Sequence, residues 1–79
     1  MRRNLVAIKQ EAGPIAVFIR ERRKSIGYTQ EELAFRTGVG VRFLKELELG
    51  KKTVRLDKAN QVLSYFGYSL MPQRIKNDS

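Results

Sequence analysis

Arg42 and Lys45 are three residues apart, so in a helix their side chains lie on the same face. Both side chains can donate hydrogen bonds to the N7 and O6 atoms of guanine, and both can pair with phosphate. The chemistry that they offer is recognition of an anion or a base edge. They follow directly on a segment of small residues, Thr37-Gly38-Val39-Gly40, which suits a tight connection between two helices.

The composition favours a polyanionic partner and argues against catalysis. The 79 residues include 16 Lys and Arg against 8 Asp and Glu, a net charge of +8, and such an excess attracts nucleic acids. The sequence has no cysteine and no histidine, which removes thiol nucleophiles and the usual zinc sites. It has no glycine-rich phosphate loop and no apolar run of about 20 residues. We therefore expect a cytoplasmic protein that is not an enzyme, with no metal, no cofactor and no membrane contact.

Apolar residues at helical spacing, together with helix stop signals, predict one small helical domain. Pro14 suits the first turn of a helix, and Gly27 suits the position after its end. Thr29 and Glu32 have the spacing of a capping box, in which each side chain bonds the backbone amide of the other residue. The four helices are expected at 15–26, 30–36, 41–49 and 56–66.

Shorter segments flank this helical body. The sequence divides into a lead-in arm or strand at 1–14, the helical domain at 15–67, a short strand at 68–72 and a flexible tail at 73–79. A lone strand leaves its backbone groups unpaired. We therefore expect the strand to pair with its two-fold mate, with Tyr68 and Leu70 at the dimer seam. Pairing with residues 5–8 of the same chain is the alternative.

The second and third predicted helices meet the physical requirements of a helix-turn-helix, in which two helices are joined by a short turn containing glycine. Ala34 is small enough for a close helix crossing, and Gly38 tolerates the positive φ that such a turn needs. Val39 supplies an apolar plug. Leu44 and Leu47 would bury one face of the third helix and leave its other face free.

The stretch "RERRKSIGYTQEELAFRTGVGVRFLKELELGK" resembles the lambda-repressor/Cro-type helix-turn-helix domain of the XRE family, and the likeness runs from about residue 15 to 66. The fourth helix, "TVRLDKANQVLSYFG", and the segment after it most resemble HipB-type antitoxins. The resemblance implies an all-α, lambda-repressor-like domain of four to five helices with a short dimerising C-terminal strand. It also implies a homodimeric repressor of a palindromic DNA operator, with a HipA-like kinase toxin as partner.

The resemblance also assigns roles to single residues. The start of the third helix would contact bases, through Gly40, Val41, Arg42, Lys45 and Glu46. The phosphate contacts would be Thr29, Gln30, Arg23, Lys51 and Lys52. Arg23 would also pair with Glu48 and fix the third helix against the first. Glu46 would accept a bond from cytosine N4 or repel phosphate, and Phe43 has three open placements: on the turn, against DNA or at a dimer seam.

Gly40 departs from the family pattern, because it replaces the Ser, Thr or Lys common there and leaves the third helix without a side-chain cap. Two other functions stay open at this point. One is a phage or plasmid-type repressor without a toxin partner, which shares the same core motif. The other is a protein that binds RNA or any nucleic acid through charge alone, and it would not need a capped helix or an ordered turn.

Overall fold

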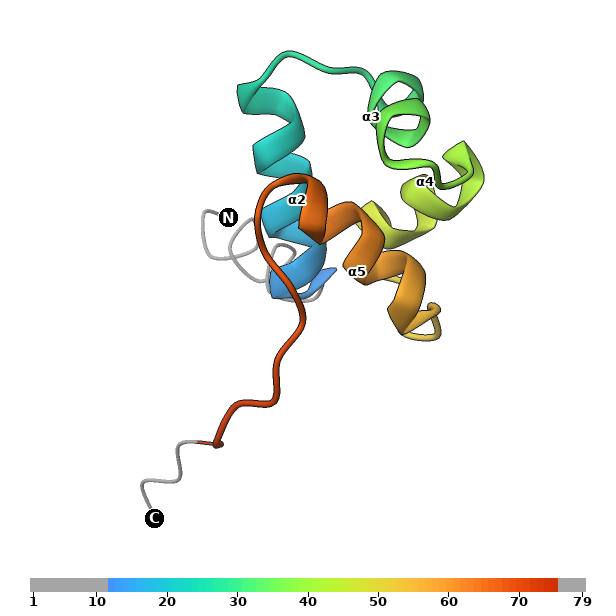
Figure 1. Cartoon of the computed structure of the whole chain (residues 1–79). Coiled ribbons are helices and arrows are strands. Elements are labelled where there is room, and N and C mark those ends of the chain that lie inside the picture. Colours follow the sequence, from blue (N-terminus) through green and yellow to red (C-terminus); the bar gives the residue numbers. More distant parts are fainter. Residues whose placement is uncertain (1–11, 76–79) are drawn as a thin grey trace, which may run out of the picture.

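The computed structural model describes residues 12–75, and four helices account for most of this range (Figure 1). The helices are α2 (Pro14–Ser25), α3 (Gln30–Thr37), α4 (Val41–Leu49) and α5 (Leu56–Tyr65). The predicted ends of these helices differ from the observed ones by no more than one residue. Residues 1–11 of the lead-in predicted at 1–14, and residues 76–79 of the predicted tail, lie outside the described residues.

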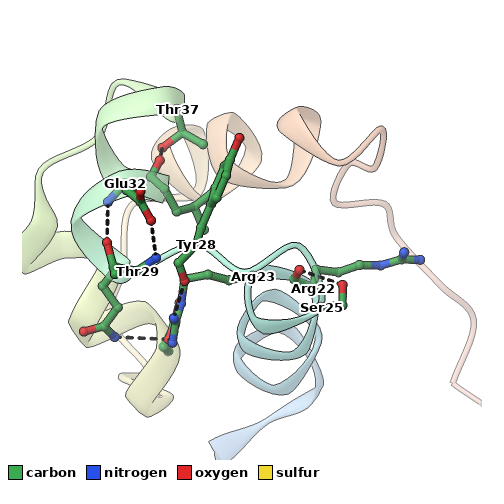
Figure 2. Close-up of polar contacts among 10 residues, drawn as sticks. Arg22, Arg23, Ser25, Tyr28, Thr29, Glu32 and Thr37 are labelled. Carbon is green, nitrogen blue, oxygen red and sulfur yellow. Dashed lines mark hydrogen bonds and ion pairs between the residues drawn. The ribbon is translucent and has the colours of Figure 1, made fainter.

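Local signals begin and end the helices as predicted. Glu32 N–H donates to Thr29 Oγ1 at 3.0 Å, and Thr29 N–H donates to Glu32 Oε1 at 2.8 Å, so the predicted capping box is confirmed (Figure 2). Gly38 ends α3 in the left-handed region, with φ of 82°, and its N–H donates to the Ala34 carbonyl. A side chain at this φ is strained, so glycine permits the turn into α4.

One apolar core joins the four helices. Its four largest fully buried side chains come one from each helix: Ile19, Leu33, Leu44 and Val62. The predicted burial of Leu44 and Leu47 on α4 is confirmed. On α5 the buried residues are Ala59, Val62 and Leu63, whereas Leu56 is 69% exposed. Leu56 occupies the first turn of α5, at the edge of the packed region.

The predicted C-terminal strand is absent from the described residues, so this part of the predicted fold was wrong for the single chain. The segment after α5 instead contacts its own domain before it extends away from the helices (Figure 1). The Tyr68 ring lies 4.6 Å from the Phe18 ring, and Arg22 donates to the Tyr68 hydroxyl. Leu70 N–H donates to Asn60 Oδ1 at 2.6 Å. A side chain thus satisfies the backbone donor that a strand would have paired.

Ala34→Leu is expected to lower the free energy of unfolding by about 1–3 kcal/mol, because added methyl groups in a packed core force side chains or backbone to move. Ala34 is buried in the core, on a helix that packs against both α4 and α5. Phe35→Leu is the matched control on the exposed side of α3. Urea unfolding followed by circular dichroism measures both variants. Equal stability of the Ala34→Leu variant and the wild type would contradict the close helix crossing.

Candidate nucleic-acid interface

The first turn of α4 is open to solvent and has no side-chain cap. Gly40 is the N-cap residue, with φ of −71° and ψ of 150°, and no side chain bonds the first amides of α4. This backbone conformation does not require glycine, and a Cβ atom at Gly40 would meet no heavy atom within 4 Å. The free amides of a helix N-terminus attract anions. The absent cap therefore leaves this end of α4 available to an anionic partner.

The exposed face of α4 presents cationic side chains. The Arg42 side chain is 92% exposed, and Lys45 is also exposed. Val41 is half-buried and packs against the edge of the core, which leaves part of its side chain accessible. Phe43 is half-buried too and packs on the core, so contact with its own domain accounts for much of its surface. The face opposite Leu44 therefore presents two exposed cationic side chains to solvent.

Glu46 lies between two of the cations at this surface. Its Oε2 atom is 3.9 Å from Arg42 Nε, one helical turn earlier. Its Oε1 atom is 3.3 Å from Lys51 Nζ, in the segment after α4. Lys51 and its neighbour Lys52 are both exposed and continue the positive surface beyond the end of α4.

A nearly buried ion pair ties α4 to α2. Arg23 Nε donates to Glu48 Oε2 at 2.8 Å, and Arg23 Nη2 donates to Glu48 Oε1 at 2.9 Å. The side chains are only 12% and 2% exposed. A third bond runs from Arg23 Nη1 to the Tyr28 carbonyl, drawn in Figure 2. The hydrogen bonds to Glu48 raise the pKa of Arg23 above its ordinary value. The structure thus brings together the two residues that the sequence paired.

The start of α3 is fixed to the same ion pair. Gln30 Nε2 donates to Glu48 Oε1 at 3.1 Å. The Thr29 side chain is held by the capping box with Glu32. The two predicted phosphate contacts at this helix end therefore have defined positions, Gln30 through Glu48 and Thr29 through Glu32. Arg23, in contrast, uses its guanidinium within the protein and has little exposed surface.

The turn is also supported by a contact that the sequence did not reveal. Gln61 on α5 donates from Nε2 to the Thr37 carbonyl at 2.7 Å. The Thr37 hydroxyl donates to the Leu33 carbonyl at 2.8 Å. The sequence around Gln61 does not predict this bond, because its two partners lie 24 residues apart in the chain. The last turn of α3 is thus stabilised by one hydrogen bond from α5 and by one within α3 itself.

Residues 12–75 contain no group of three Cys, His, Asp or Glu side chains placed to hold a metal ion. Among the described helices, none has the length and apolar character needed to cross a membrane.

Two short helices joined by a glycine turn, with the second helix presenting an exposed cationic face, define a helix-turn-helix domain, the DNA-binding class. Comparison with known proteins places the chain within that class. A helix-turn-helix family model matches residues 19–71, and the chain belongs to this XRE-type helix-turn-helix family. The predicted XRE-type resemblance is therefore confirmed at the level of the family.

A relative shows the same family membership. The chain is 43% identical over 56 residues to the uncharacterized HTH-type transcriptional regulator y4mF of Sinorhizobium fredii. The match covers 71% of this chain and 74% of the relative. No solved structure matches the chain.

Proposed function

We propose that this protein is a homodimeric, sequence-specific transcriptional repressor that inserts α4 into the major groove of a palindromic DNA operator. The observation that supports this most is the arrangement of α4. One face is packed in the core through Leu44, and the helix is tied to α2 by Glu48. The other face presents Arg42 and Lys45 to solvent. A rigid helix with a free cationic face suits recognition of base edges.

The residues divide into two groups by the contact proposed for them. Arg42 is the main base contact, since its guanidinium matches guanine N7 and O6, and Lys45 lies one turn further along α4. The rest of the proposed base surface is Gly40, Val41 and Glu46. The proposed phosphate contacts are Thr29, Gln30, Lys51 and Lys52, which provide affinity without sequence preference. Arg23 was also expected to contact phosphate, but its burial with Glu48 favours a positioning role.

A dimer is part of the proposal because one small domain covers one half-site. Two-fold related half-sites lie about one helical turn apart, roughly 34 Å. The segment after α5 is the proposed seam, as the sequence suggested for Tyr68 and Leu70. Its support is the exposure of two apolar side chains beyond Leu70, Met71 at 76% and Ile75 at 85%.

Deletion of residues 71–79 tests this seam, and it keeps the contacts of Tyr68 and Leu70 with their own domain. Sedimentation at micromolar concentration should show a dimer for the full chain and a monomer for the truncated chain, with unchanged helical content. A truncated chain that remains dimeric would show that Met71 and Ile75 do not form the seam.

The narrower form of the proposal is that the repressor is the antitoxin of a toxin–antitoxin pair and represses its own operon. Its support is the sequence resemblance of residues 53–67 to HipB-type antitoxins. A HipA-like kinase would then be the second protein partner. Co-purification with the product of the adjacent gene tests this role. An adjacent phage lysogeny cassette would instead favour a repressor without a toxin.

Selection from a library of random DNA duplexes tests sequence-specific binding. Wild-type protein is expected to enrich a two-fold symmetric motif whose half-sites are about one helical turn apart. An enriched pool without a motif would show that the protein binds DNA through charge alone.

Lys51→Ala is expected to weaken binding to selected and random duplexes by similar factors, because a phosphate contact is independent of sequence. Loss of one such contact should also reduce the slope of log K against log salt concentration by about one unit. Fluorescence anisotropy at several salt concentrations measures both effects. Lys24→Ala, an exposed lysine at the end of α2, is the control with the same change of charge. An unchanged slope in the Lys51→Ala variant would contradict a phosphate contact.

A further inference from the structure

Glu46 is the only carboxylate among the residues proposed to contact DNA, and its neighbours explain how an acidic residue is useful there. Its two carboxylate oxygens each face one cation, Arg42 at 3.9 Å and Lys51 at 3.3 Å. Both cations belong to the proposed DNA surface, one as a base contact and the other as a phosphate contact. The carboxylate therefore occupies the place that a DNA phosphate would otherwise take beside these cations.

We propose that Glu46 raises specificity because it lies between Arg42 and Lys51, where its carboxylate repels the phosphate that Arg42 pairs with on random DNA. This inference rests on the proposed function of α4 as the base-contacting helix. It gives Glu46 a role in choosing between sequences that does not depend on a direct bond to a base.

Binding to random DNA and binding to the operator have different effects on the surroundings of Glu46. On random DNA no base edge matches Arg42, so Arg42 and Lys51 both pair with phosphates. Both contacts of Glu46 are then lost, and its charge remains close to the phosphates that replaced it. On the operator Lys51 also pairs with a phosphate, but Arg42 bonds guanine in the groove, so one phosphate fewer lies close to the Glu46 carboxylate. Random DNA therefore loses more binding free energy to Glu46 than the operator does.

The size of the effect follows from the exposure of these contacts. Exposed ion pairs are individually weak because water screens them. Two such contacts, with repulsion of nearby phosphate, correspond to about a threefold to tenfold change in affinity. An effect of this size is measurable, and it acts on every non-specific site that competes with the operator.

Glu46→Gln tests the proposal, with anisotropy titrations of a selected operator and a random duplex at equal salt. We expect random DNA to bind about threefold to tenfold tighter and the operator to gain less, so that the specificity ratio falls. Glu21→Gln, on the exposed surface of α2, is the control with the same change of charge. It should change both affinities by one small common factor. Equal behaviour of the two variants would overturn the proposal.

A second comparison separates an effect that depends on the two cations from a general effect of negative charge. Glu46→Gln is repeated in a chain that already carries Arg42→Ala and Lys51→Ala. If Glu46 acts through these cations, its effect on random DNA should fall below about twofold in that background, as coupled residues are not additive. An undiminished effect would show that the carboxylate acts only as a negative charge. If the proposed function itself were wrong, the wild type would show no sequence preference. The titrations with random duplexes would then still test the role of Glu46.

Discussion

Glu48→Ala is expected to lower the free energy of unfolding by about 3 kcal/mol, the low end of the range for removing one partner of a buried ion pair. The change leaves the Arg23 guanidinium nearly buried without its bidentate partner. It also removes the acceptor of Gln30 at the start of α3. Because small domains are only marginally stable, the variant should be largely unfolded well below the melting temperature of the wild type.

Asp57→Ala is the matched control for this effect. Arg55 and Asp57 form a pair of similar length, 2.7 Å, but both side chains are well exposed. The hydrogen bond from Arg55 lowers the pKa of Asp57, yet water screens such a pair and its loss costs little. Calorimetric melting of both variants measures the contrast. Equal losses of stability would show that burial of the Arg23–Glu48 pair is not what joins α4 to α2.

Arg42→Ala is expected to remove the preference for one base pair in each half-site of a selected operator. A bidentate contact to guanine discriminates by about 1–3 kcal/mol, so a symmetric operator loses about twice that free energy of binding. Random duplexes should lose only the small contribution of one charge. Arg20→Ala, an exposed arginine on α2, controls for that charge.

Repeating the selection from random duplexes with the Arg42→Ala variant identifies the base pair concerned. The enriched motif should become degenerate at one position of each half-site and stay unchanged elsewhere. An unaltered motif would mean that Arg42 does not contact a base edge.

Much of the fold could be predicted because the signals for it are local. The capping box at Thr29 and Glu32 and the glycine at 38 act within a few residues of their own positions. They place the start of α3 and the turn into α4 without knowledge of the tertiary structure. The exposed position of Arg42 follows similarly, since burial of Leu44 and Leu47 on one face of α4 leaves the other face to solvent.

Other features depend on contacts that sequence spacing does not encode. The bond from Gln61 to Thr37 and the bond from Leu70 to Asn60 need the final packing of α5. The second of these explains why an alternating segment that resembles a strand contacts its own domain. The contact of Glu46 with Lys51 belongs to the same group, since it depends on the turn that the chain makes at Gly50 after α4. The contact of Glu46 with Arg42 does not, since residues four apart on a helix are neighbours.

Sequence-specific DNA binding through α4 is tested most directly by the ratio of two dissociation constants. The measurement compares a selected operator with a shuffled duplex of equal length and composition, at the same near-physiological salt concentration. We predict that wild-type protein binds the operator at least about a thousandfold more tightly, the lower bound typical of specific DNA-binding proteins. Equal dissociation constants for the two duplexes would contradict the account and leave only electrostatic attraction to nucleic acid.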